Sequence, residues 1–231
     1  MKIGVISDIH ANIFALDNVL KEMSKYDVSK ILVAGDLIGY YYWPKEVVSR
    51  LMTDEDVFCI AGNHEKLLKN SLENTDDAQN YRVKYGSGFD LCKKELDRNQ
   101  MNWLLSLPES LSLSFDNISF FLSHGSLDSV DEYIYPNSKS SILDQNYSSC
   151  DFTIFGNTYY PFIRCNRDKF LLNPGSVGQP RDVSALSSFV VINTENLSVQ
   201  FSRVRFDIQN ISNKIQELDP DNEYLRTVLT R

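Results

Sequence analysis

The sequence predicts an α/β fold in which a parallel sheet is covered by helices. Within residues 1–61, three apolar runs alternate with two stretches of helical hydrophobic spacing. The runs are apolar almost throughout, as in strands that are buried on both faces of a sheet. Hydrophobic residues make up 42% of the chain and charged residues 23%, which is typical of a globular protein. We expect residues 1–231 to form a single domain.

The first predicted strands and helices alternate regularly along the chain. Residues 2–7 form an apolar run that ends at Asp8, and a helical pattern begins near Ile13. Residues 31–34 and 57–61 are the next two apolar runs, and a second helical pattern lies between them. This order predicts three parallel strands joined by helices.

The remainder of the chain changes character after Pro108. Residues 66–107 are rich in helix formers and predict helices that lie beside the sheet. The following segments alternate as strands do, at residues 111–115, 118–122, 152–155, 169–172, 187–193 and 197–204. The first two are joined by Asp116-Asn117, a hairpin-type turn. We expect a more antiparallel sheet that packs against the first sheet or continues it.

The last 25 residues predict a C-terminal helical clasp on the surface, over residues 207–231. Ile208, Ile211 and Ile215 recur at helical spacing, and Asp219-Pro220 separates them from a second short helix.

Charge and composition exclude several classes of function. A formal net charge of −8 argues against a nucleic-acid polymer as partner, because such proteins neutralise phosphates with many basic side chains. A small phosphate-containing molecule fits better, since bound metal ions can reverse the local charge. No apolar stretch is long enough for a membrane span, so we expect a cytoplasmic protein without a membrane partner. The four cysteines are widely spaced, which predicts reduced and mostly buried thiols.

Polar clusters follow four of the predicted strands. They lie at residues 8–10, 35–36, 62–65 and 123–125. Ligands bind at the carboxyl ends of strands in open α/β sheets, so these clusters should meet in space. The three histidines of the chain, His10, His64 and His124, all belong to them. An ordinary set of histidines would include one in a helix or tail, so we interpret these three as ligands or catalytic groups.

The residue types suit a centre of two divalent ions that activates water. Asp36 stands alone at its strand end and is the natural bridge between the ions. Asp8 and His10 are alternate residues that could chelate one ion. Asn63 and His124 offer an amide oxygen and an imidazole nitrogen to the other.

His64 is adjacent to a predicted ligand in sequence but should point elsewhere. It could protonate the departing oxygen or stabilise the charge that develops there, with Asn63 beside it in the catalytic site. Glu65 could orient His64.

These motifs, in this order, resemble the calcineurin-like metallophosphoesterase superfamily. The likeness includes the phrases SDIHANIFAL, GDLIGY and LNPGSVGQPRD and extends over about residues 1–206. The resemblance implies a four-layer αββα sandwich of two mixed sheets flanked by helices. It also implies metal-dependent hydrolysis of phosphomonoesters or phosphodiesters, including nucleotide-derived ones, by a bridging hydroxide.

The chain departs from this family at one motif. The resemblance implies a Gly-His-x-His sequence with one histidine for each metal, but Asn157 and Tyr159 stand at these places. Asn157 could still donate an amide oxygen as a ligand. Tyr159 is a poor ligand unless its phenol ionises, which is costly near neutral pH.

Three explanations of this departure remain open. The chain is an enzyme with a looser metal pair, another residue supplies the missing ligand, or the chain is a non-catalytic metal-binding, nucleotide-binding or regulatory protein. We expect two divalent ions, with Mn²⁺ as the leading candidate and Fe, Zn or Ni as alternatives, because the mixed ligand set selects no single metal.

Three further residues are candidates for substrate binding, each with a structural alternative. Tyr41 belongs to the aromatic loop at residues 39–44, which could wall the pocket, cover the sheet edge or form a contact in a homo-oligomer. Asn12 could touch a phosphate or cap the first helix. Arg181 could grip a phosphate or pair with Asp182.

Tyr133 and Tyr135 are a last pair of candidates. They could line the pocket, although packing is the simpler interpretation.

Overall fold

Strand β1 (Lys2–Ile6) occupies the centre of the first sheet in a computed structural model that describes residues 1–230. The strand order in this sheet is β10-β9-β1-β2-β3. Strands β2 (Lys30–Val33) and β3 (Val57–Cys59) run parallel to β1, as predicted. Strand β9 (Leu186–Asn193) pairs antiparallel with β1, and β10 (Val199–Arg205) pairs antiparallel with β9. The last two strands therefore continue the first sheet.

The second sheet has the order β4-β5-β6-β8-β7. Its central strands β5 (Ile118–Ser123), β6 (Phe152–Ile154) and β8 (Lys169–Asn173) run parallel. The edge strands β4 (Ser110–Phe115) and β7 (Phe162–Asn166) pair antiparallel with β5 and β8. Both sheets are thus mixed, and the expectation of a mainly antiparallel second sheet holds only at its edges.

The sequence predicts only one of the two hairpins of the second sheet. Asp116 and Asn117 join β4 to β5 with φ angles of 49° and 64°, which suits a turn with two left-handed residues. Strand β7 was not predicted. Its outer half is polar and exposed, and Arg167, with a φ of 57°, takes the left-handed place of the turn to β8.

Alternating side chains of β1 divide the core into two layers. Ile3 and Val5 point toward the second sheet and are fully buried. Gly4 points the other way, toward α1, and a methyl group there would lie 2.4 Å from Met23 Sδ. The core between the sheets consists of Ile3, Val5, Leu32, Ala34, Ile60, Phe120, Leu122, Phe152, Ile154, Leu172, Val190 and Ile192. Each large side chain buried here contributes about 1.5–3 kcal/mol, which holds the sheets face to face.

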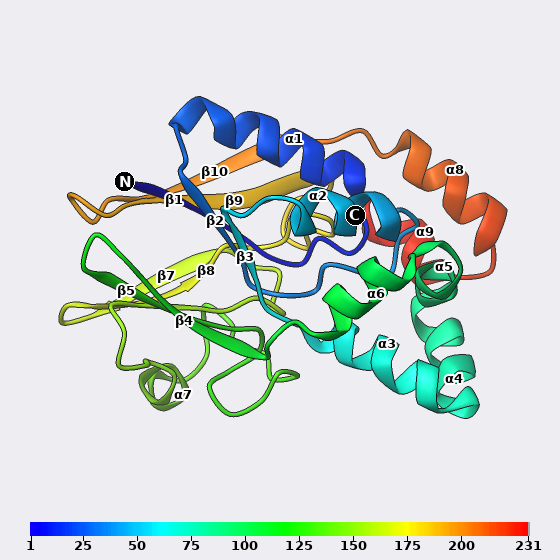
Figure 1. The fold of residues 1–231 in the computed structure, drawn as a ribbon, viewed down its shortest axis with the longest axis horizontal. Helices are drawn as coiled ribbons and strands as arrows, with labels where there is room; N and C mark the ends of the chain where they lie inside the picture. Colours follow the sequence, from blue (N-terminus) through cyan, green and yellow to red (C-terminus); the bar gives the residue numbers. More distant parts are fainter. Residues whose placement is uncertain (231) are drawn as a thin grey trace.

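Helices form the two outer layers, as Figure 1 shows. Helices α1 (Ile13–Met23) and α2 (Pro44–Met52) cover the first sheet, and α8 (Gln209–Leu218) continues this layer beyond the ends of the strands. The short helix α7 (Ser140–Gln145) lies against the outer face of the second sheet. The result is the four-layer αββα arrangement that the sequence resemblance implied.

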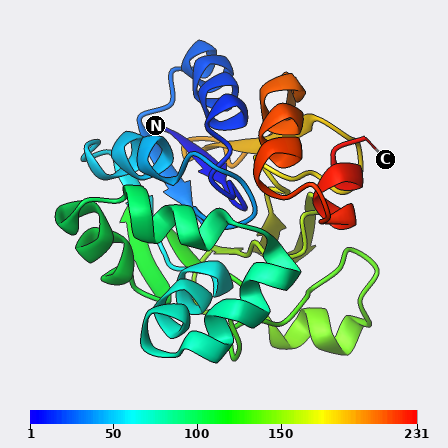
Figure 2. The same cartoon turned by 90° about the vertical axis from the view of Figure 1, so that its right-hand side faces the viewer.

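Four more helices gather at the end of the sandwich where the parallel strands finish (Figure 2). They are α3 (Asn63–Glu73), α4 (Thr75–Tyr85), α5 (Gly88–Glu95) and α6 (Arg98–Leu105). The predicted helices within residues 66–107 therefore lie beside the sheet edge, over the loops that carry the polar clusters.

The C-terminal segment reaches the same end of the molecule. Helix α9 (Glu223–Val228) follows α8, and Asp219 between them accepts hydrogen bonds from the Ser87 backbone and from the Tyr42 hydroxyl. The clasp predicted over residues 207–231 thus ties α8 and α9 to the α4–α5 junction. Its last residue, 231, lies outside the described residues.

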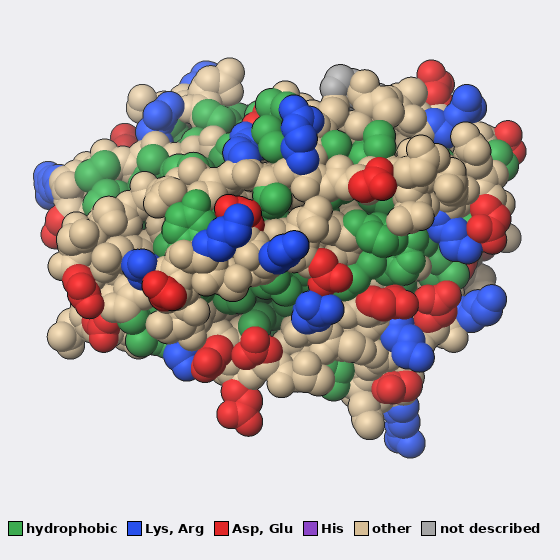
Figure 3. All heavy atoms as spheres, turned by 90° about the horizontal axis from the view of Figure 1, so that it is seen from above, with side chains coloured by type: hydrophobic (Ala, Val, Ile, Leu, Met, Phe, Trp, Pro, Cys, Tyr) green, Lys and Arg blue, Asp and Glu red, His purple; other side chains and the backbone are tan. Residues whose placement is uncertain are grey.

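Charges are mixed over the face seen in Figure 3, where basic and acidic side chains are interspersed among apolar ones. None of the helices in residues 1–230 combines the length and apolar character that spanning a bilayer requires. All four cysteines are free; Cys59 and Cys92 are buried, whereas Cys150 is half-buried and Cys165 exposed.

Candidate metal centre

Asp36 lies at the centre of the three histidines. Its carboxylate oxygen Oδ2 is 3.3 Å from His124 Nε2, 3.8 Å from His10 Nε2 and 4.0 Å from His64 Nε2. All four side chains are at most 2% exposed. The loops that follow β1, β2, β3 and β5 therefore converge, as the sequence predicted from parallel strands ending at one edge.

The backbone bends sharply to bring these side chains inward. Asp8, His10 and Asp36 have φ angles of 54°, 52° and 55°, in the left-handed region. Aspartate tolerates this region, but it costs a histidine about 1–2 kcal/mol. Backbone hydrogen bonds between the two loops hold the geometry, including His10 N to the Asp36 carbonyl at 3.0 Å. A methyl group at Gly62 would lie 2.2 Å from Asp36 Oδ1, so this approach requires glycine.

Glu65 supports the Asp36 loop and does not orient His64 as predicted. Its carboxylate accepts hydrogen bonds from the backbone N–H groups of Gly62, Asp36, Leu37 and Ile38, at 2.6 to 3.2 Å. Burial and the nearby Asp36 raise the pKa of Glu65 to about 7, against the lowering effect of these donors. The prediction failed because a carboxylate three residues past a helix N-cap is within reach of several unpaired N–H groups.

Two of the histidines have a defined tautomer. His10 Nδ1 lies 3.2 Å from the Ile38 carbonyl, and His124 Nδ1 lies 2.6 Å from the Ala34 carbonyl. A carbonyl only accepts, so both Nδ1 atoms carry hydrogen and both Nε2 atoms turn toward Asp36. This is the arrangement of a metal-binding imidazole whose other nitrogen is held by the backbone.

The third histidine is held differently. The His64 backbone donates to Asp36 Oδ1 at 2.8 Å, whereas its side-chain Nδ1 is buried with no partner among the described residues. Burial lowers the pKa of His64 to about 4. The side chain is therefore neutral near pH 7 and offers a hydrogen bond rather than a full positive charge.

Asp36 and His124 form a buried ion pair. Burial alone would raise the pKa of Asp36, but the positive charge and the hydrogen bond of His124 hold it well below the ordinary value. Burial alone would lower the pKa of His124, but Asp36 raises it to about 10. Without a metal, a proton on His124 thus balances the Asp36 charge.

Asp8 provides the test of whether a metal fits this centre. Both of its carboxylate oxygens are buried and have no hydrogen-bond partner within residues 1–230. Burial and the negative charge of Asp36 raise the pKa of Asp8 to about 7, although the positive charges of His124 and Arg181 favour its ionised form. Single ligand atoms of Asp8, Asp36 and His124 lie within 4.8 Å of one another. A divalent cation among them would satisfy Asp8, so these residues fit a metal.

The Asn63 amide adds a fourth donor to this group. The amide atom that faces inward is 3.1 Å from His124 Nε2 and 3.1 Å from Asp36 Oδ2. Without a cation, the amide nitrogen is the favourable atom there, because it donates to Asp36. A cation would favour the oxygen, so Asn63 can serve as a ligand by turning its amide.

The two residues at the places of the expected histidines have different surroundings. Tyr159 is 2% exposed, and its hydroxyl lies 2.8 Å from His10 Nε2. Asn157 is held by a hydrogen bond of 3.1 Å from its Nδ2 to the Glu132 carbonyl. This bond holds the amide nitrogen of Asn157 and leaves its oxygen, the predicted ligand atom, outside the contact.

Two of the predicted substrate contacts have structural partners instead. Asn12 caps α1: its Oδ1 accepts from Ala15 N at 3.1 Å, and its Nδ2 donates to the Gly178 carbonyl at 2.8 Å. Tyr41 is fully buried, and its hydroxyl accepts from Gln179 at 3.2 Å. The capping interpretation of Asn12 thus agrees with the structure, and Tyr41 does not wall an open pocket.

Arg181 lies next to the centre. Its guanidinium carbon is 3.6 Å from the centroid of the Tyr159 ring. The alternative of a pair with Asp182 is wrong, because Asp182 binds Arg203. Arg181 Nε is buried and has no hydrogen-bond partner in the part of the chain that the structure describes. An unpaired guanidinium beside a phosphate-type centre is suited to binding an anion.

Two further tyrosines, Tyr40 and Tyr224, belong to the surroundings of the histidines. The Tyr40 ring centroid is 4.8 Å from those of both His10 and His64. Tyr224, on α9, packs 5.7 Å from Tyr40 and donates its hydroxyl to Gln179. Tyr40 follows the Asp36 strand and was visible in the aromatic loop, but no local signal marks Tyr224.

Tyr133 and Tyr135 pack on each other at the surface, in agreement with the simpler interpretation. They are 45% and 40% exposed and stack on each other with centroids 6.0 Å apart.

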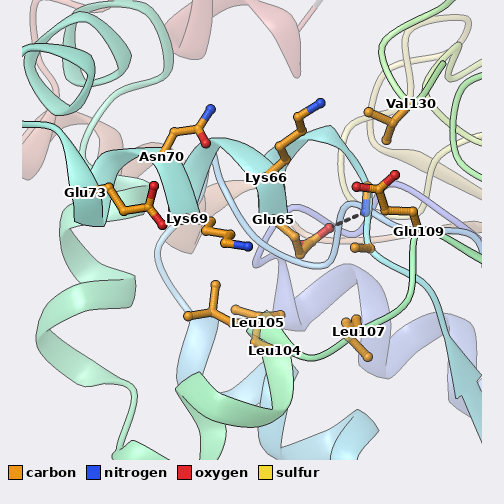
Figure 4. A pocket seen from close by; sticks show the side chains of 12 residues that line it. Glu65, Lys66, Lys69, Asn70, Glu73, Leu104, Leu105, Leu107, Glu109 and Val130 are labelled. Carbon is orange, nitrogen blue, oxygen red and sulfur yellow. Dashed lines mark hydrogen bonds between the residues drawn. The ribbon is translucent and has the colours of Figure 1, made fainter.

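A cavity of about 360 Å³ opens beside the centre, on the outer side of α3 (Figure 4). Figure 4 shows Lys66 and Lys69 on its α3 wall, with Glu65 hydrogen-bonded to the backbone at its base. Neither Asp36 nor a histidine lines it. This cavity is therefore separate from the metal ligands, which the Glu65 layer divides from it.

Comparison with known proteins identifies the family. Residues 1–197 match the calcineurin-like phosphoesterase superfamily domain. The chain belongs to this superfamily. The uncharacterized protein MJ0912 of Methanocaldococcus jannaschii is 30% identical over 233 residues, covering 92% of this chain and 91% of that protein.

Two further proteins extend the comparison. The crystal structure of a metallophosphoesterase from Sphaerobacter thermophilus superposes with a TM-score of 0.81 at 26% identity, covering 99% of this chain and 98% of that one. Phosphodiesterase YfcE of Escherichia coli (strain K12) is 22% identical over 208 residues, covering 86% of this chain and 91% of that protein. The predicted family and fold are thus confirmed, and hydrolase chemistry on phosphate esters is the general activity of the superfamily.

Proposed function

We propose that the chain is a metal-dependent phosphoesterase that hydrolyses small phosphate esters, with phosphodiesters as the leading substrate class. The observation that carries the proposal is the Asp8 carboxylate, which is buried beside Asp36 and His124 with neither oxygen paired. A buried and unpaired carboxylate lowers the stability of the fold unless it binds a cation or a proton. The superfamily membership and the phosphodiesterase YfcE favour the cation.

Asp8, Asp36, Asn63 and His124 would hold the metal. A divalent ion there would supply a water of lowered pKa and positive charge for the phosphate. The mixed carboxylate, amide and imidazole set suits Mn²⁺, with Fe, Zn or Ni as alternatives. The sequence predicted a centre of two ions. Such a centre requires a second set of ligands around Asp36, and their ligand atoms must be available to the second ion while the first is bound.

His64 and Arg181 would act on the substrate. The His64 side chain would donate a hydrogen bond to the leaving oxygen. Because its pKa is low, it would do so as a neutral imidazole near pH 7. Arg181 has no carboxylate partner among residues 1–230 and would bind the phosphate oxygens. Glu65 would keep the Asp36 loop in place without touching the substrate.

The experiment is hydrolysis of bis-p-nitrophenyl phosphate and p-nitrophenyl phosphate by protein treated with EDTA and then reloaded with each metal. We expect activity that depends on metal and falls at least about 100-fold in Asp36→Asn. Activity that survives both EDTA and this substitution would contradict the proposal. The exposed Asp168→Asn variant is the matched control and should retain full activity.

A second function has support from the closed site. The six residues first predicted to form the centre include five side chains that are at most 2% exposed, and two expected histidines are absent. A metal-binding or regulatory protein without turnover would have these features. Stoichiometric metal binding with no hydrolysis of either ester would favour this alternative.

A further inference from the structure

Two groups of candidate ligands share Asp36. One consists of Asp8, Asp36 and His124, and the other of His10, Asp36 and His64. In each group, single ligand atoms lie within 4.8 Å of one another. Two such groups around one carboxylate would suit two ions, provided that the ligand atoms of each group are available to a cation.

The first group is open. Asp8 presents two carboxylate oxygens with no partner in residues 1–230, and His124 Nε2 turns toward Asp36 at 3.3 Å. A cation here would displace only the contact between His124 Nε2 and the Asn63 amide.

The second group is closed by Tyr159. The contact between His10 Nδ1 and the Ile38 carbonyl places the lone pair of neutral His10 on Nε2. That lone pair is the one a metal would use, and the Tyr159 hydroxyl donates to it at 2.8 Å. The rings of His10 and Tyr159 are nearly parallel, with an interplanar angle of 14° and centroids 5.4 Å apart. Tyr159 is almost fully buried, so it has little room to swing away.

A positive charge already occupies this side of the centre. The Arg181 guanidinium lies 3.6 Å from the centroid of the Tyr159 ring, a favourable cation–π distance. No carboxylate among the described residues forms an ion pair with it, since Asp182 is bound to Arg203. A second metal ion beside Tyr159 would therefore meet both a blocked ligand and a nearby cation.

We propose that the chain binds one divalent ion, at Asp8, Asp36, Asn63 and His124, and that the Tyr159 hydroxyl fills the second metal position. In this arrangement His10 is a positioning residue that holds Tyr159 and is not a metal ligand. Arg181 supplies the positive charge that a second ion would have brought to the phosphate. The inference rests on the proposed metal-dependent function, which it narrows to a single-ion centre.

The experiment measures Mn²⁺ binding to metal-stripped protein, without substrate. Stoichiometry and affinity come from isothermal titration calorimetry, and electron paramagnetic resonance distinguishes an isolated ion from a spin-coupled pair. We expect one Mn²⁺ per wild-type chain with the signal of an isolated ion. Two ions of similar affinity would overturn the inference and leave the proposed function intact, whereas no binding at all would sink the proposed function itself.

Substitutions at the two contact residues separate the roles. His10→Gln should retain one Mn²⁺ with a Kd within about threefold of wild type, while Asp8→Asn should weaken binding at least about 100-fold. A large loss of affinity in His10→Gln would identify His10 as a ligand and overturn the inference.

Tyr159→His restores an imidazole where the phenol stands, so we expect two Mn²⁺ per chain and a spin-coupled signal. Tyr133→His, at a neighbouring exposed tyrosine, is the matched control and should still bind one. A folded Tyr159→His protein that binds only one ion would contradict the role of Tyr159. If that variant does not fold, the His10→Gln measurement decides.

Discussion

The Asp36 carboxylate lies 3.3 Å from His124 Nε2, and both side chains are fully buried. This contact is the shortest between the Asp36 carboxylate and a histidine ring, and it shifts the pKa of both partners toward the charged pair. The pair exists without a metal because the proton on His124 takes the place that a cation would take. Because His124 binds its proton more tightly in the folded protein, the stability of the metal-free protein depends on pH.

The first prediction concerns this pH dependence. His124 has a pKa of about 10 in the folded chain and an ordinary value of 6.5 when unfolded. Its contribution to stability is therefore fully present below pH 6.5 and is lost as pH rises toward 10. Between pH 7 and 9, urea unfolding in EDTA should show a loss of roughly 2 to 3 kcal/mol.

His124→Gln is the control for that measurement. It should be less stable at pH 7 but should lose less between pH 7 and 9, because the titrating group is gone. An unchanged slope in this variant would assign the pH dependence to other groups.

The second prediction tests Glu65 as the support of the Asp36 loop. Glu65→Ala leaves four buried N–H groups without their acceptor, so the free energy of unfolding should fall by about 3 to 5 kcal/mol. Glu65→Gln keeps one acceptor oxygen and should lose less. The exposed Glu73→Ala, on the same helix, should change stability by less than about 0.5 kcal/mol. Equal losses in Glu65→Ala and Glu73→Ala would refute the role.

The third prediction tests Arg181 as a phosphate contact. Arg181→Gln removes a charged donor that has no carboxylate partner in the described chain, so KM for bis-p-nitrophenyl phosphate should rise about tenfold. Steady-state kinetics at saturating metal provide the measurement. Arg203→Gln breaks a surface ion pair with Asp182 and should leave KM unchanged. A similar rise in both variants would point to loop disorder instead.

The fourth prediction tests the position of His64. A methyl group at Gly39 would lie 2.0 Å from His64 Nδ1, and Gly39 has a φ of 86°. Gly39→Ala should therefore displace His64 and lower kcat about tenfold or more, with reduced thermal stability.

Gly86→Ala is its matched control. Gly86 also has a positive φ, of 77°, but the nearest neighbour of an added methyl group there is the side chain of Leu225 and not a histidine. This variant should lose stability without loss of kcat in the protein that remains folded. A normal kcat in Gly39→Ala would show that His64 tolerates displacement.

Much of the fold was predictable because its signals are local. Apolar runs and helical spacing identified β1, β2, β3 and the helices between them, since burial on both faces leaves an unbroken apolar pattern. The hairpin at Asp116 and Asn117 was visible in its turn residues. Strand β7 was missed because its exposed half is polar, and polar residues at a sheet edge carry little strand signal.

The ligand residues were also predictable by position. Asp8, Asp36 and His124 each follow an apolar strand, and parallel strands end at the same edge, so their convergence follows from topology. The sequence by itself thus determined the superfamily, the first three parallel strands and the group of side chains that meets at Asp36.

Only the tertiary structure decided how these side chains are paired. The Tyr159 hydroxyl meets His10 across 149 positions of sequence, and α9 brings Tyr224 next to Tyr40. Glu65 turned out to bind backbone N–H groups rather than His64. Such contacts depend on ångström-scale distances and on which nitrogen carries hydrogen, and neither residue type nor spacing along the chain specifies these.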